Sequence, residues 1–117
     1  MDRFRRIAPG FPVRDVDAAL AHYARLGFAT RRYEGADEYG FATAGEIEIL
    51  VGVPADVEEC GRATAYLFVD DADALAAEWI AAGIEVHLPV DTEWGQREGA
   101  VVDPDGNVIR FGSPLAD

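Results

Sequence analysis

The sequence predicts an α+β fold built from two tandem βαβββ modules. Residues 13–28 (VRDVDAALAHYARLGF) resemble residues 69–84 (VDDADALAAEWIAAGI) with a constant offset of 56 and no gaps. Apolar segments of strand length precede and follow each copy. A repeat of this size indicates two copies of one supersecondary unit, and one unit alone is too small to bury its helix and its sheet. We therefore expect two modules, about 1–55 and 62–117, in a single domain over residues 1–117.

Each copy of the repeat is predicted to be a helix with a marked start and end. Asp15 and Asp71 precede the helices as N-caps, and Gly27 and Gly83 supply the left-handed residue that ends them. Between these limits apolar residues recur at helical spacing. They are Val16, Ala19, Leu20 and Tyr23 in the first copy and Ala72, Leu75, Ala76 and Trp79 in the second. We expect the inward-facing Trp79 side chain to lie in the core.

The strands are predicted from β-branched or alternating segments around the helices. The expected ranges after the first helix are 28–33, 39–43 and 46–53, and those of the second module are 64–69, 84–88, 97–102 and 107–111. The last two strands are joined by Asp103-Pro104-Asp105-Gly106-Asn107, a combination typical of a tight turn, so they should form a hairpin.

Alternation along these strands predicts a second face with a different character. Ala65, Leu67 and Val69 can cover a helix, which leaves Thr64, Tyr66 and Phe68 on the opposite face. That opposite face is partly aromatic and partly charged, as in a binding surface. We therefore expect a curved mixed sheet that lines a cleft, with the helices on its outer face.

The charge and the composition exclude several classes of function. The chain has 22 acidic and 10 basic residues and a formal net charge of −12, which argues against a nucleic-acid partner. Excess acidic charge favours solubility and also attracts cationic ligands. No apolar segment is long enough to span a membrane, the first residues lack an export signal, and Cys60 has no second cysteine to pair with. We expect a cytoplasmic protein without a membrane partner.

The doubled βαβββ unit and the segments VRDVDAALAHYARLGF and DPDGNVIRF resemble the glyoxalase/bleomycin-resistance/dioxygenase (vicinal oxygen chelate) superfamily. Three local stretches resemble its drug-binding, bleomycin-resistance branch in particular. They are Pro9 shortly before Arg14-Asp15-Val16, residues 65–69 running to Ala77-Glu78-Trp79, and Trp94-Gly95 followed by Arg97-Glu98 and the DPDGN turn. The doubled βαβββ unit extends the resemblance over nearly the whole chain, and the likeness is greatest to the drug-binding branch. It implies a bacterial antibiotic-resistance protein: a homodimer that sequesters a cationic, planar aromatic, bleomycin-like glycopeptide in clefts at the subunit interface. It also implies that Pro9 is a hinge for exchange of the N-terminal strand.

The enzymatic branches of this superfamily hold a divalent metal with four side chains, two from each module. The resemblance places these positions at Ala8, Thr64, at or beside Glu48, and at Arg110. Alanine, threonine and arginine do not supply the imidazole or carboxylate donors that such a metal needs. We therefore expect no metal, no cofactor and no catalytic residue.

Seven residues are expected to bind the ligand: Tyr33, Tyr39, Glu48, Tyr66, Phe68, Trp94 and Arg110. The aromatic rings would stack on a planar ligand, and Glu34, Asp37, Glu38 and Glu48 would supply negative charge. Two structural alternatives stay open at this point. Tyr66 and Phe68 can be covered by a second subunit, and Arg110 can form an ion pair with Glu48 across the sheet.

Two other functions also fit the sequence. One is an enzyme of the same fold, a lyase or an isomerase, in which Glu48 does acid–base work and Arg110 holds an anionic substrate. The other is a binding module for an unrelated metabolite, because fold alone does not fix function.

Overall fold

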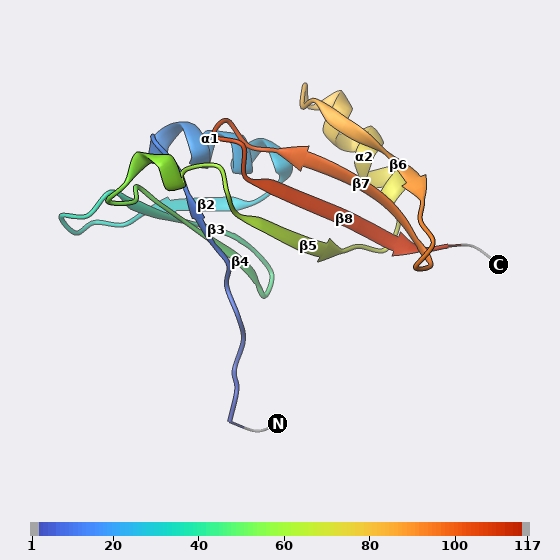
Figure 1. The fold of residues 1–117 in the computed structure, drawn as a ribbon, viewed down its shortest axis with the longest axis horizontal. Helices are drawn as coiled ribbons and strands as arrows, with labels where there is room; N and C mark the ends of the chain where they lie inside the picture. Colours follow the sequence, from blue (N-terminus) through green and yellow to red (C-terminus); the bar gives the residue numbers. More distant parts are fainter. Residues whose placement is uncertain (1–2, 116–117) are drawn as a thin grey trace.

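The computed structural model describes residues 3–115 and contains two modules with the same order of elements (Figure 1). The first contains β1 (Gly10–Pro12), α1 (Val16–Leu26), β2 (Ala29–Arg32), β3 (Tyr39–Ala44) and β4 (Ile47–Gly52). The second contains β5 (Thr64–Phe68), α2 (Ala72–Ala81), β6 (Val86–Asp91), β7 (Gln96–Val102) and β8 (Val108–Pro114), after a short 3-10 helix, η1 (Val57–Glu59). The predicted α+β fold is confirmed. Within the described part of the chain, no helix is long and apolar enough to cross a membrane.

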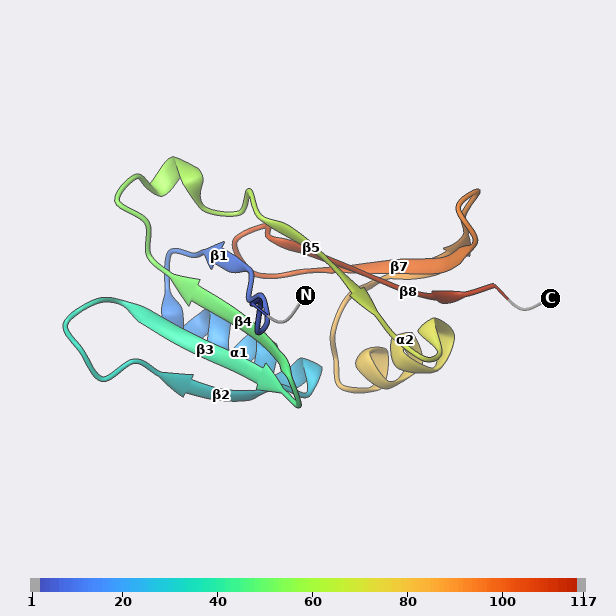
Figure 2. The same ribbon diagram turned by 90° about the horizontal axis from the view of Figure 1, so that it is seen from below.

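The predicted sheet is divided into two four-stranded mixed sheets, one in each module. Their strand orders are β1-β4-β3-β2 and β5-β8-β7-β6, so the two modules have one topology. In each sheet the first strand pairs in parallel with the last, and the remaining pairs are antiparallel. Figure 2 shows the two modules side by side, each with its own helix against its sheet. We call the sheet face opposite each helix the open face.

The helix limits follow the predicted caps. The Asp15 carboxylate accepts a hydrogen bond from the backbone N–H of Ala18, and Asp71 does the same for Ala74. Gly27 ends α1 with a φ of 110°, a conformation that favours glycine. Two strands have limits that differ from the prediction by more than one residue at an end. The strand expected at 84–88 is Val86–Asp91, because Ile84 is buried in the connection after α2, and the strand expected at 107–111 is Val108–Pro114.

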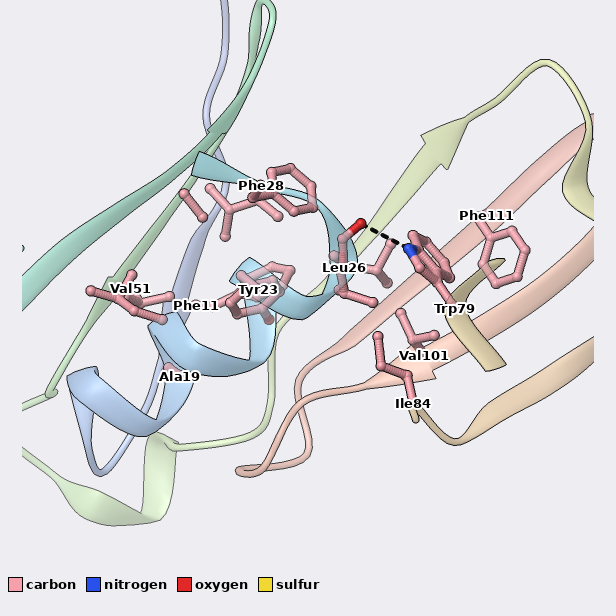
Figure 3. Close-up of a cluster of buried hydrophobic side chains, with 14 of the residues drawn as sticks. Phe11, Ala19, Tyr23, Leu26, Phe28, Val51, Trp79, Ile84, Val101 and Phe111 are labelled. Carbon is pink, nitrogen blue, oxygen red and sulfur yellow. Dashed lines mark hydrogen bonds between the residues drawn. The ribbon is translucent and has the colours of Figure 1, made fainter. Parts of the chain in front are cut away.

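The buried side chains of both modules form one hydrophobic cluster (Figure 3). Trp79 is 4% exposed, as predicted, and its ring meets Phe111 edge-on with centroids 4.9 Å apart. Its indole N–H donates a hydrogen bond to the Leu26 carbonyl at 2.8 Å, which joins α2 to the end of α1. The helices are therefore held together by packing and by a directed hydrogen bond.

The DPDGN turn forms the predicted hairpin and also links the two modules. Asp103 Oδ1 accepts hydrogen bonds from three backbone N–H groups of the turn, each at 2.9 Å. The buried Asn107 side chain donates to the Pro12 carbonyl at 2.9 Å and accepts from the Ala63 N–H at 3.0 Å. The Tyr23 hydroxyl of α1 donates to Asp103 Oδ2 at 3.0 Å. The turn thus fixes how one module sits on the other.

Stability at alkaline pH should depend on Tyr23. Burial, with the adjacent Asp103 carboxylate, raises the pKa of the Tyr23 hydroxyl far above its usual value. The unfolded chain therefore loses this proton near pH ~10 while the folded chain keeps it, so the free energy of unfolding decreases as the pH rises further. We expect urea unfolding from about pH 9 to 11 to show this decrease in the wild type, with a slope smaller by about one proton in Tyr23→Phe.

The sequence contains no lysine, so few other groups titrate in this range. Tyr33→Phe, which removes an exposed tyrosine, is the matched control and should keep the wild-type slope. Equal slopes for Tyr23→Phe and the wild type would show that the Tyr23 hydroxyl does not cause the loss of stability at alkaline pH.

Candidate ligand-binding site

The open face of the first module carries a row of aromatic rings. The Tyr39 ring packs edge-to-face against two neighbours, with ring centroids 6.3 Å from Tyr33 and 5.4 Å from Phe41. Together with Asp37 they line a hollow of about 260 Å³. The Arg31 guanidinium lies 4.1 Å from the centre of the Phe41 ring, so a cation stacks on one of the rings that border this hollow.

The open face of the second module carries a second aromatic group. Tyr66 and Phe68 lie on β5 with ring centroids 4.9 Å apart, and Trp94 lies in the turn between β6 and β7. Phe68 is 75% exposed and Trp94 is 63% exposed, so neither ring belongs to the hydrophobic core. The Arg110 guanidinium lies 5.3 Å from the centre of the Tyr66 ring.

Gly112 on β8 determines how Tyr66 lies on this face. In the strand register Gly112 stands between Phe68 of β5 and Glu98 of β7. A Cβ atom at position 112 would come within 2.1 Å of the Tyr66 hydroxyl, so only glycine leaves room for the ring. The Tyr66 hydroxyl consequently lies toward Glu98, and burial raises its pKa, with Glu98 adding to the effect.

Glu98 is the residue of this face that we did not predict. Its side chain is only 14% exposed, and Arg110 Nη1 lies 3.7 Å from its Oε2 atom. The Trp94 indole N–H donates to Glu98 Oε1 at 3.3 Å. The sequence contained a signal for this position. Side chains alternate between the two faces of a strand, and because Gly99 and Val101 lie on the buried face of β7, Glu98 must lie on the opposite face.

A groove of about 530 Å³ lies where the two modules meet. It is lined mainly by Ile7–Pro9, by residues 46–49 and by residues 65–68, so Glu48, Tyr66 and Phe68 border it. Glu48 forms an ion pair with Arg6 at 2.7 Å. The alternative in which Glu48 pairs with Arg110 is wrong, because the N-terminal segment brings Arg6 to Glu48 and Arg110 lies beside Glu98.

One chain does not bring the seven expected ligand residues together. Tyr33 and Tyr39 belong to the end of the molecule that carries the β2–β3 loop, and Trp94 belongs to the end that carries the β6–β7 turn. These ends lie at opposite extremes of the long axis in both views (Figures 1 and 2). The longest dimension of the chain is 50 Å, so one small ligand cannot reach both groups in a single chain. The acidic residues are also partly neutralised, because Glu38 pairs with Arg32.

The metal positions of the fold do not carry a donor set for a metal here. The strand registers pair Gly10 with Leu50 in the first module and Tyr66 with Arg110 in the second. Gly10 therefore corresponds to Tyr66 in the repeat, and Leu50 corresponds to Arg110. The neighbouring row two residues earlier contains Ala8, Glu48, Thr64 and Val108. Glu48 and Arg110 therefore belong to different rows, and neither row has more than one carboxylate. Among residues 3–115, no three His, Cys, Asp or Glu side chains lie together as a potential metal site.

The chain belongs to the Glyoxalase/Bleomycin resistance protein/Dioxygenase superfamily, whose family model matches residues 3–111. A search of curated proteins found no match.

Three solved structures are similar over nearly the full length of the chain. TnmS3, an antibiotic binding protein from Streptomyces sp. CB03234, is 25% identical, with coverage of 96% of this chain and 98% of that one and a TM-score of 0.81. The bleomycin-binding protein of bleomycin-producing Streptomyces verticillus, complexed with copper(II)-bleomycin, has the same identity and coverage and a TM-score of 0.80. A further bleomycin-binding protein complexed with bleomycin is 25% identical, with coverage of 96% and 100% and a TM-score of 0.78.

Substitution of Gly112 should disturb the second open face specifically. Gly112 is not among the glycines with positive φ, so Gly112→Ala does not strain the backbone, but its methyl group displaces Tyr66. We expect a loss of about 1–3 kcal/mol in the free energy of unfolding and a shift in tryptophan emission, because Trp94 and Tyr66 both adjoin Glu98.

Gly10→Ala is the control, since no described atom lies within 4 Å of a Cβ at that position. It should change stability by less than about 0.5 kcal/mol. If both variants had the same small effect, Gly112 would not be the residue that positions Tyr66.

Proposed function

We propose that this protein is a metal-independent, homodimeric binding protein that sequesters a cationic, planar aromatic antibiotic of the bleomycin type. The observation that carries the proposal is the presence of two exposed aromatic faces at opposite ends of one chain. Each face offers stacking surface, and neither encloses a ligand by itself. If two copies pair about a twofold axis, with their long axes antiparallel, the Tyr33–Tyr39–Phe41 face of one meets the Tyr66–Phe68–Trp94 face of the other, which gives two equivalent clefts.

The N-terminal segment supports an exchange of strands between the two copies. Figure 1 shows it leaving the body of the molecule before β1, with Phe4 74% exposed and Ile7 90% exposed. The Pro9 carbonyl accepts a hydrogen bond from the Leu50 N–H at 2.9 Å, and β1 itself begins only at Gly10. Exposed apolar residues of this kind favour burial against another chain. Pro9 is then the hinge at which the segment crosses to the second copy.

The charge of the chain supports a cationic ligand. The net charge of −12 attracts cations at long range, and the shielded Glu98 carboxylate offers a local partner beside Trp94 and Tyr66. The similar antibiotic-binding and bleomycin-binding proteins indicate the kind of molecule. The alternative of an acid–base enzyme that uses Glu48 with Arg110 lacks support, because the two side chains are not paired.

Titration with copper-loaded bleomycin tests this proposal. We expect saturable quenching of tryptophan fluorescence at one ligand per chain, unchanged when the protein is first treated with EDTA. Trp94→Ala should weaken binding by tenfold or more in calorimetry, because aromatic anchors of this kind carry a large share of binding energy. Leu88→Ala removes another exposed apolar side chain of the same module and should bind normally.

Absence of binding at high micromolar drug would reject the bleomycin-type ligand and leave the unrelated metabolite as the next candidate. Sedimentation velocity should give a species of twice the 12.7 kDa chain mass. A monomer at all concentrations would contradict the interface cleft.

A further inference from the structure

Two buried polar atoms on one open face have no hydrogen-bond partner. In residues 3–115 the only such side-chain atoms are the Tyr66 hydroxyl and Gln96 Oε1. Gln96 lies two residues before Glu98 on β7, so both side chains are on the same face of the strand, and Tyr66 lies toward Glu98 across Gly112. Buried polar atoms are nearly always satisfied in folded proteins. Two such atoms on one face of the second module therefore point to a missing partner from outside the chain.

Glu98 itself is only loosely engaged. Its contacts to Trp94 at 3.3 Å and to Arg110 at 3.7 Å are longer than strong charge-assisted hydrogen bonds, which measure about 2.7–2.9 Å. Glu48 provides the contrast, since it holds Arg6 at 2.7 Å although it is equally shielded, with 15% of its side chain exposed. Glu98 also raises the pKa of the nearby Tyr66 hydroxyl, but its two carboxylate oxygens can still accept a hydrogen bond from a further donor.

We infer that Gln96 and Glu98, framed by Tyr66 and Trp94, form a subsite that selects planar aromatic ligands carrying N–H donors, preferably cationic ones such as an aromatic amine or amidinium. The inference rests on the proposed function and specifies its ligand. Gln96 Oε1 and the Glu98 carboxylate are all acceptors, so they require donors on the ligand. The exposed Trp94 and Phe68 rings provide the stacking surface that brings the edge of the ligand to those acceptors.

The test compares two probes that share one ring system. The aromatic cation 9-aminoacridine carries an amino donor, whereas acridine lacks that group and is neutral at neutral pH. We expect the wild type to bind 9-aminoacridine at least about tenfold more tightly than acridine. Glu98→Gln should weaken 9-aminoacridine binding by about tenfold or more and leave acridine binding unchanged. Glu93→Gln, which removes the same charge from an exposed position beside Trp94, should leave both affinities unchanged.

Three results would overturn the inference: equal affinity of the wild type for both probes, including no binding of either; an equal loss for both probes in Glu98→Gln; or an equal effect of Glu93→Gln and Glu98→Gln. Sedimentation of each variant at the titration concentration establishes that the association state is unchanged.

The proposed drug-binding function can fail independently of this subsite. If copper-bleomycin does not bind but 9-aminoacridine binds in a Glu98-dependent way, the subsite stands and its natural ligand is another cationic aromatic compound.

Discussion

Each module has one helix for a four-stranded sheet, so only one face of each sheet can be covered. Everything else in the molecule follows from that constraint. The covered faces merge into one core through Trp79 and the DPDGN turn, and the uncovered faces keep their aromatic side chains exposed. A face that displays Phe68 and Trp94 to solvent is costly unless something binds there. The covered faces therefore provide the core that stabilises the fold, and the uncovered faces provide the surface proposed to bind a ligand.

The two sides of the sheets also differ in how their polar groups are satisfied. On the helix side, Tyr23, Asp103 and Asn107 exchange close hydrogen bonds that tie the modules together. On the open face of the second module, the Tyr66 hydroxyl and Gln96 Oε1 have no partner, and Glu98 is held loosely. Satisfied buried networks specify one structure, whereas incomplete ones mark places where a ligand can add the remaining bonds. The proposed ligand site therefore coincides with the part of the molecule whose polar groups are incompletely satisfied.

Much of the fold could be predicted because its signals are local. The repeat, the Asp15 and Asp71 caps, the DPDGN turn and the buried Trp79 depend on short-range patterns. The site was harder because it depends on tertiary placement. No local pattern says that Arg6 of the N-terminal segment reaches Glu48, or that Gly112 makes room for the Tyr66 ring. Strand alternation predicted that Tyr66 and Phe68 lie on the face opposite the helix, but only the structure shows that the two aromatic groups lie at opposite ends of the chain.

The most direct test of this account is a complementation titration with Tyr39→Ala and Trp94→Ala. Each variant alone should bind copper-bleomycin weakly. If a cleft joins Tyr39 of one chain to Trp94 of the other, unfolding and refolding the two variants together yields mixed dimers in which one cleft is intact. Calorimetry should then recover wild-type affinity at about one site per mixed dimer. If no high-affinity binding returns although mixed dimers form, the two faces do not share a ligand, and the central claim is wrong.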